Sequence, residues 1–326
     1  MLLDHLDDQQ LLFFGGKGGV GKTTCAAATA LSCAQRGERV LLISTDPAHN
    51  LGHLFEHSIG DDGHSLSETL DVIEIDAART TAAHLKQVEA TMRRLSPPRL
   101  HKEIERHVQL AAHAPGTHEA AILERIAQLV DVHRTTHDRI VVDTAPSGHT
   151  ARLLALPELM SAWTDGLLRR RDTADRLSAA ARGLSAKDAA VAAASPLEQR
   201  NQELRHILHE RRELFARLRD LLSDAHRCAF ILVLTAEALP VAETIEFHHE
   251  LTCHQGLRVP ALVVNRRSPV DQGEFLARRH EVEEQHLATL REALPDVPLV
   301  QIPLLEHDIV GTEQLHDFAR HTAGER

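Results

Sequence analysis

A glycine-rich stretch near the N-terminus has the residue types and spacing of a phosphate-binding loop. Gly16, Gly21, Lys22 and Thr23 match the pattern G-x-x-x-x-G-K-[ST]. In such a loop, successive backbone N–H groups face phosphate oxygens, and the N-terminus of the following helix adds partial positive charge. The lysine reaches the β- and γ-phosphates, and the next hydroxyl binds Mg²⁺. We expect the nucleotide to contact the whole loop, which comprises Gly16, Lys17, Gly18, Gly19, Val20, Gly21, Lys22, Thr23 and Thr24.

Two carboxylates follow apolar runs further along the chain. The run from Arg39 to Ser44 leads into Asp46, and the run Arg139 to Val142 ends in Asp143. Ligands of open α/β sheets bind at the carboxyl ends of the strands, so we expect both carboxylates near the phosphates. Asp143 is placed as a Walker B aspartate, which supports Mg²⁺ through water. These residues predict a site for nucleotide phosphates and Mg²⁺.

The elements that must position these residues alternate between buried strands and helices. Apolar runs predict seven strands, and helices are expected at 25–34, near 241–254 and at 272–293. This alternation predicts an α/β fold with a doubly wound, mostly parallel sheet. Residues 1–10 are polar and are expected to form a loose lead-in. The expected strands are 11–14, 39–44, 72–75, 139–142, 229–235, 259–264 and 299–302.

Two long helical segments interrupt this alternation, at about 79–136 and 151–224. The first is broken into about three pieces by Pro97-Pro98 and Pro115-Gly116. The second contains a dense apolar stripe at 153–168 and a long helix from about Leu197. We expect one domain, residues 1–326, that carries a helical subdomain built from these two insertions.

Composition limits the classes of protein. The net charge of −11 does not favour a nucleic-acid surface. No apolar run approaches the roughly 20 residues of a membrane span, and no signal peptide is expected at the start. Four scattered cysteines in a chain with a phosphate-binding loop favour the reducing cytoplasm.

The chain contains 24 histidines, of which three have a regular spacing. His49, His53 and His57 are four residues apart, which would stack them on one helix face. A metal site there lacks a carboxylate or cysteine partner. Composition bias is the favoured explanation, with metal binding as the alternative.

Several motifs together resemble those of the ArsA family. The form Lys-Gly-Gly-Val-Gly-Lys-Thr, which begins at Lys17, resembles the deviant Walker A loop of the class that includes MinD, ParA, nitrogenase iron protein and ArsA. Segments 44–51 and 143–152 resemble the two switch segments of the ArsA family. The resemblance continues at 263–265, 302–304 and 310–311, and thus spans nearly the whole chain. This family includes the arsenite-pump ATPase and the ATPase that delivers tail-anchored membrane proteins.

The resemblance implies roles for individual residues in an ATPase that uses ATP and Mg²⁺. Lys17 would reach the nucleotide of a partner subunit in a homodimer, and Asp46 would orient the attacking water. Asp143 would support Mg²⁺ and sense the γ-phosphate. Asn265 would read adenine and Pro303 would line the base pocket, although an asparagine after a strand is often a turn residue and a proline a strand terminator. The switch segments would include Asp46, Pro47, Asp143 and Gly148.

Cysteine positions differ from those of both well-known members. The targeting ATPase of fungi and animals has a Cys-x-x-Cys zinc motif after the Asn265 region, whereas residues 266–294 contain no cysteine here. The arsenite-pump ATPase collects As(III) on three cysteines in a chain of two fused halves, and this chain has one half. Cys25 and Cys33 lie in the helix behind the phosphate loop and are expected to be buried. Cys228 and Cys253 would make an incomplete site of two thiols.

Three functions remain open at this stage. The first is a homodimeric ATPase whose nucleotide cycle opens and closes a helical region that binds hydrophobic, tail-anchored-like segments of membrane proteins. The alternative is an ATPase subunit that drives an arsenite or anion efflux permease. The third, a MinD-like membrane-cycling ATPase, is disfavoured, since it needs a basic amphipathic C-terminal helix and residues 315–326 are short, His-rich and weakly apolar.

Overall fold

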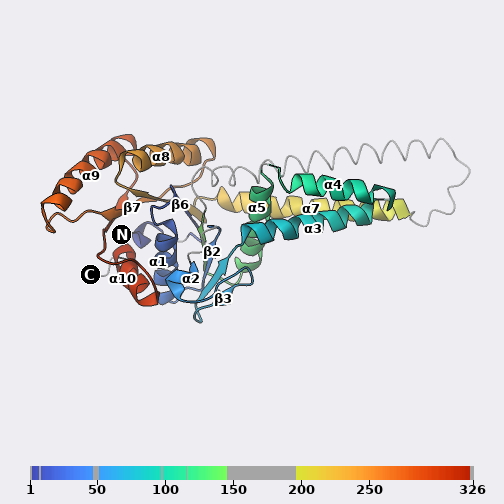
Figure 1. The fold of residues 1–326 in the computed structure, drawn as a ribbon, viewed down its shortest axis with the longest axis horizontal. Helices are drawn as coiled ribbons and strands as arrows, with labels where there is room; N and C mark the ends of the chain where they lie inside the picture. The colour runs from blue at the N-terminus through green and yellow to red at the C-terminus, as the bar shows by residue number, and fades with distance from the viewer. Residues whose placement is uncertain are drawn as a thin grey trace, which may run out of the picture. The chain divides into compact units, whose positions relative to one another are not determined.

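The computed structural model describes residues 2–6, 9–46, 51–96, 98–114, 116–144 and 196–323 (Figure 1). The chain divides into two compact units. The first, called the sheet unit, comprises residues 1–77, 129–154 and 220–326. The second, called the helical unit, comprises residues 78–128 and 155–219.

The described residues of the sheet unit form one sheet of eight strands, in the order β3-β4-β2-β5-β1-β6-β7-β8. All neighbouring strands are parallel except β3 and β4, which are antiparallel. The predicted doubly wound, mostly parallel α/β sheet is therefore confirmed. The strands are β1 (Leu11–Gly15), β2 (Val40–Ser44), β3 (His64–Ser65), β4 (Leu70–Glu74), β5 (Arg139–Asp143), β6 (Cys228–Thr235), β7 (Ala261–Arg267) and β8 (Leu299–Pro303).

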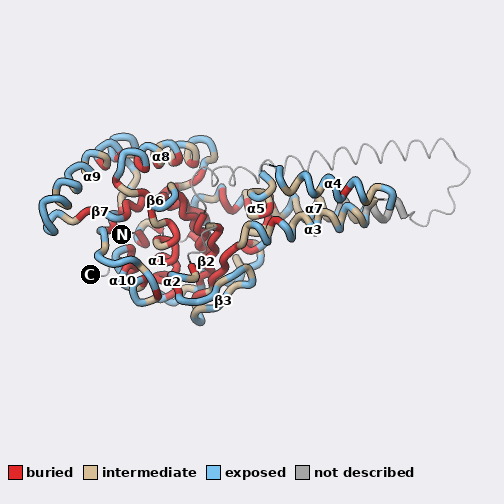
Figure 2. The backbone as a smooth tube through the Cα atoms, viewed as in Figure 1, coloured by how far each residue is buried: buried red, intermediate tan, exposed pale blue. Residues whose placement is uncertain are grey.

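Helices cover both faces of this sheet, so its central strands are buried along their whole length (Figure 2). Leu12 and Phe14 belong to the core that α1 completes. On the opposite face, Phe13 stacks on Phe230 with ring centroids 4.9 Å apart. The helices that lie in the described residues of the sheet unit are η1 (Leu3–His5), α1 (Lys22–Gln35), α2 (Leu51–Phe55), α8 (Ala238–His249), the π-helical turn η3 (Glu250–His254), α9 (Glu274–Ala293) and α10 (Thr312–Ala323).

The N-terminal residues pack more closely than the sequence predicted. The expectation of a loose lead-in was wrong, because Leu2, Leu3 and Leu6 are buried and the Leu2 N–H donates to the carbonyl of Thr322 at 3.1 Å. The end of the chain forms α10, which packs on α1 and buries one side of its surface, including Phe318. An apolar face already used in the core does not favour a membrane-binding helix.

The histidine array does not lie on one helix. Helix α2 ends at Phe55, and Glu56 has a left-handed φ of 55°. His57 lies beyond this bend, where its Nδ1 is 2.6 Å from the carbonyl oxygen of Phe55. The prediction that His57 shares a helix face with His53 is therefore wrong. His49 lies outside the described residues.

The described residues of the helical unit form long helices joined by short connections. The first insertion contains three α-helices separated near the predicted proline breaks, which confirms its division into three pieces. The predicted apolar stripe at 153–168 lies outside the described residues. Within the described ranges, no helix combines the length and apolar character needed to cross a membrane. The helices that contribute to this unit are α3 (Ala77–Leu95), η2 (Pro98–Leu100), α4 (His101–Ala111), α5 (Thr117–His133) and α7 (Pro196–Leu222), and the unit boundaries fall within α5 and α7.

Candidate nucleotide-binding site

The predicted phosphate loop connects β1 to α1 at the carboxyl end of the central strand, the edge at which α/β sheets bind ligands. Two of its glycines are required by close packing. A Cβ on Gly16 (φ 142°) would lie 2.1 Å from the carbonyl oxygen of Val233, and one on Gly21 (φ 96°) would lie 2.4 Å from Asn265 Nδ2. Only glycine fits both the conformation and the space at these positions.

Lys22 is the first residue of α1 and is almost completely buried. Its Nζ donates a hydrogen bond to the carbonyl of Lys17 at 3.0 Å, so the side chain spans the loop. Burial lowers the pKa of its ammonium group, and the charges of Asp143 and Asp46 act in the opposite direction. A buried cation is costly unless anions compensate it, and this location therefore favours binding of phosphate.

Asp143 ends β5 and is fully buried. Its Oδ2 accepts hydrogen bonds from Thr23 Oγ1 at 2.7 Å and Ser44 Oγ at 3.1 Å. Burial raises the pKa of this carboxyl to about 7, despite the opposing effects of Thr23 and Lys22. Its Oδ1 has no hydrogen-bond partner among the described residues. A threonine hydroxyl beside a carboxylate with an unused oxygen is a donor set that fits Mg²⁺, which prefers oxygen ligands.

A short chain of hydrogen bonds connects Asp46 to this carboxylate. The Asp46 N–H donates to Ser44 Oγ at 3.2 Å, and Ser44 Oγ donates to Asp143. The structure thus brings together four of the predicted residues: Lys22, Thr23, Asp46 and Asp143. The predicted switch residues Pro47 and Gly148 lie outside the described residues.

Lys17, the other lysine of the loop, has a different environment. Its Nζ is 3.2 Å from Glu243 Oε1 on α8, and each side chain is about one-third exposed, at 34% and 37%. Sequence reasoning did not single out Glu243, because a glutamate on an expected helix gives no sign of which distant residue it contacts.

Next to the loop lies a cavity of about 600 Å³. It is lined by Thr24 and by Asn265 and Pro303, the two residues predicted to contact the adenine base of the nucleotide. The Asn265 amide also contacts the loop, since its Nδ2 donates to the carbonyl of Val20 at 2.9 Å. Sequence reasoning missed Arg266 and most of the segment after β8. The cavity is lined by Gly21, Thr24, Asn265, Arg266, Pro303, Leu304, Leu305, Glu306, His307, Asp308, Ile309 and Phe318.

Three of the four cysteines are buried. The expected burial of Cys25 and Cys33 is confirmed, and it raises the pKa of both thiols to about 12. Cys228 is also buried, whereas Cys253 is exposed. In the part of the chain that the structure describes, no three histidine, cysteine or acidic side chains gather as a metal site.

Comparison with known proteins agrees with this geometry. Residues 9–323 match the family model described as anion-transporting ATPase. The chain is 34% identical to "Putative arsenical pump-driving ATPase 2" of Aquifex aeolicus, over 95% of this chain and 98% of the relative. It is 29% identical to "ATPase ASNA1 homolog 1" of Paramecium tetraurelia, over 97% and 94% of the two chains. The "Arsenical pump-driving ATPase" of Escherichia coli is 31% identical over 93% of this chain, which spans about half (48%) of that relative. The chain therefore belongs to the ArsA family of anion-transporting ATPases, and it is an ATPase.

Proposed function

We propose that the chain binds ATP and Mg²⁺ at the end of β1 and hydrolyses the γ-phosphate there. The observation that carries this proposal is the convergence of Lys22, Thr23 and the unused Oδ1 of Asp143 on one side of the phosphate loop. Phosphoryl transfer depends on positioning and charge neutralisation, and these are the groups that can supply both.

Each group has a distinct task in this mechanism. The hydroxyl of Thr23 would bind Mg²⁺ and the carboxylate of Asp143 would support it through water; when bound, Mg²⁺ would neutralise charge on the phosphate oxygens. Lys22 would place its buried ammonium group against the β- and γ-phosphates. Asp46 would orient the attacking water, and Ser44 connects its backbone to Asp143.

Lys17 would act on the nucleotide of a second copy of the chain in a homodimer. Its ammonium group is held by Glu243 of the same chain through a partly exposed ion pair. Pairs of this kind contribute only roughly 0–1 kcal/mol. Moving Lys17 to a γ-phosphate therefore costs little, and ATP would favour the closed dimer by mass action.

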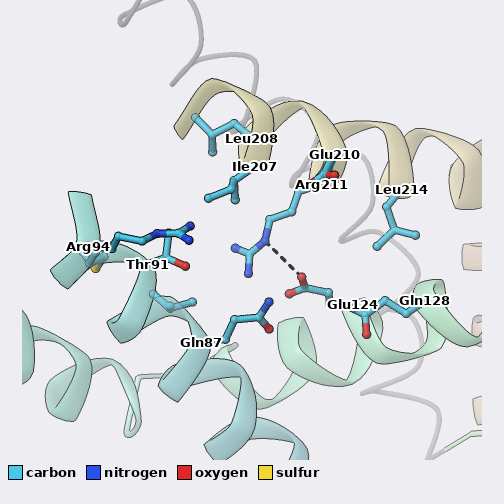
Figure 3. A pocket seen from close by; sticks show the side chains of 12 residues that line it. Gln87, Thr91, Arg94, Glu124, Gln128, Ile207, Leu208, Glu210, Arg211 and Leu214 are labelled. Carbon is cyan, nitrogen blue, oxygen red and sulfur yellow. Dashed lines mark ion pairs between the residues drawn. The ribbon is translucent and has the colours of Figure 1, made fainter. Parts of the chain in front are cut away.

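We further propose that the nucleotide cycle opens and closes the helical unit around a hydrophobic client segment, such as that of a tail-anchored-like membrane protein. The support is a pocket of about 480 Å³ within this unit (Figure 3). Apolar side chains from α3 and α7, including Met92 and Leu208, line it together with polar groups. Glu124 of α5 lies at its wall, 3.2 Å from Arg211 Nε on α7. The lining is Gln87, Val88, Thr91, Met92, Arg94, Glu124, Gln128, Ile207, Leu208, Glu210, Arg211 and Leu214.

A second candidate function is the ATPase subunit of an arsenite or anion efflux permease. The names of the Aquifex and Escherichia coli relatives favour it. The cysteines do not, because soft As(III) prefers several converging thiolates and three of the four cysteines are separately buried.

Light scattering tests the dimer directly. We expect monomer or loose dimer without nucleotide or with ADP, and a compact dimer with a non-hydrolysable ATP analogue. Asp46→Asn should remain dimeric in ATP itself, because it hydrolyses ATP slowly. An identical oligomeric state under all these conditions would refute the nucleotide-dependent dimer.

Cross-linking of an apolar helical peptide tests the client site. Met92→Glu places a charge in the pocket and should reduce capture of the peptide. Leu110→Glu, on α4, is the matched control, because Leu110 is also an exposed apolar residue (64%) but does not line the pocket. Equal capture by both variants would remove this pocket from the proposal, and strong stimulation of hydrolysis by arsenite would favour the permease function.

A further inference from the structure

Two consecutive carbonyl groups of the phosphate loop are held by two consecutive residues at the end of β7. The Asn265 side chain donates from Nδ2 to the carbonyl of Val20 at 2.9 Å. The Arg266 side chain donates from Nη1 to the carbonyl of Gly19 at 3.2 Å. A distant part of the chain therefore contacts the outer side of the loop at two adjacent peptide groups.

The geometry of the peptide bond gives these contacts a consequence. No cis peptide occurs in the described chain, and in a trans peptide the C=O and the next N–H point in opposite directions. Carbonyls held towards residues 265 and 266 therefore turn the N–H groups of Val20 and Gly21 away from these residues. In phosphate-binding loops such N–H groups form the anion-binding concavity.

We propose that Arg266 is a positioning residue of the nucleotide site, which with Asn265 holds the Gly19 and Val20 carbonyls so that the following N–H groups face the phosphates. This inference rests on the proposed nucleotide site. Arg266 acts through the loop backbone, since its guanidinium group donates a hydrogen bond to the uncharged carbonyl of Gly19.

The backbone at Arg266 is held in an unusual conformation that places its side chain. Its φ is 58°, which is uncommon for a residue with a Cβ. The Arg266 N–H donates to Asn265 Oδ1 at 2.9 Å, which stabilises the bend. Beyond the bend, the buried carboxylate of Glu283 accepts hydrogen bonds from Arg267 and from the Ser268 N–H. Such conformations persist when the surroundings over-determine them, and they concentrate at functional sites.

The same contacts extend the role of Asn265. Its Nδ2 donates to the carbonyl of Val20, and its Oδ1 accepts from the Arg266 N–H. The side-chain amide therefore orients the loop in addition to any contact with a base. Because Arg266 acts through the loop backbone that would hold the phosphates, its replacement should not alter the preference for adenine over guanine nucleotides.

Arg266→Gly tests this role, because glycine adopts a positive φ without strain and removes only the side chain. Calorimetry should show about 3- to 10-fold weaker binding of ATP and ADP, the equivalent of one lost hydrogen bond. Binding of adenosine, which has no phosphate, should be unchanged, as should the thermal unfolding midpoint. Arg278→Gln is the control, because Arg278 is exposed on α9, and it should bind all three ligands normally.

Salt dependence separates positioning from direct attraction of phosphate. The difference between wild type and Arg266→Gly should be the same at low and high ionic strength if the guanidinium acts on the loop carbonyl. A difference that disappears at high salt would show long-range attraction and overturn the inference. Equal loss for adenosine would also overturn it, in favour of a base contact. Failure of the wild-type protein to bind ATP would refute the proposed function itself.

Discussion

The buried carboxyl group of Asp143 should make the nucleotide-free protein progressively less stable as pH rises from about 4 to 7, and Asp143→Asn should remove this loss of stability. Asparagine keeps the shape of the side chain and an oxygen that can accept from Thr23 and Ser44, but it cannot ionise. Burial raises the pKa of Asp143 from the usual 3.8 to about 7. At about 1.4 kcal/mol for each pKa unit, ionisation of the folded protein at pH 8 costs roughly 4 kcal/mol as an upper limit.

The sign and pH range follow from the two pKa values. Below about pH 4 both the folded and the unfolded protein carry the proton, so the cost is absent. Between about pH 4 and 7 the unfolded chain releases its proton while the folded protein retains it, so the free energy of unfolding falls as pH rises. Above about pH 7 both states are ionised and the cost is constant.

Urea denaturation of wild type and Asp143→Asn between pH 4 and 8, without nucleotide or Mg²⁺, measures this effect. The variant should gain stability relative to wild type as pH rises, and be more stable by about 2–4 kcal/mol at pH 8. Its Mg²⁺-dependent hydrolysis should fall by roughly 10- to 100-fold, as is typical for residues that orient metal ligands. A stability difference that is flat with pH, or a variant less stable at pH 8, would refute the assignment of a high pKa to Asp143.

Three further predictions concern the loop and the cysteines. Lys22→Ala should weaken ATP binding about 10- to 100-fold, since a charge-assisted contact is lost. Lys17→Ala should bind ATP normally but hydrolyse it slowly. A normal rate of hydrolysis by Lys17→Ala in steady-state assays would exclude the proposed role of Lys17 in a dimer. Gly16→Ala should lower the free energy of unfolding by roughly 1–3 kcal/mol in urea titrations, because its Cβ would meet the Val233 carbonyl; an unchanged midpoint would contradict the packing. Arsenite should stimulate ATP hydrolysis weakly or not at all, and Cys253→Ser should respond to arsenite as the wild type does. Strong stimulation of the wild type that is lost in Cys253→Ser would favour an arsenite site formed by thiols.

Most of the fold and the centre of the site were predictable because their signals are local. The strand, glycine turn and helix around Lys22 lie within 25 residues of sequence, and each element has its own pattern. The positions of Asp46 and Asp143 followed from one topological rule, that the carboxyl ends of parallel strands share an edge. The single-domain organisation remains a prediction, as do the roles assigned to individual residues.

Contacts between distant segments depended on the tertiary structure. Gly19 and Arg266 are 247 positions apart, and Lys17 and Glu243 are 226 apart. A residue pattern indicates which side of an element is buried, but it does not identify the group that is packed against it. The same reason explains the buried N-terminal leucines, because the surface that covers them includes the last helix of the chain. The pKa of Asp143 likewise depends on burial by several strands together, a property that arises only when the sheet has assembled.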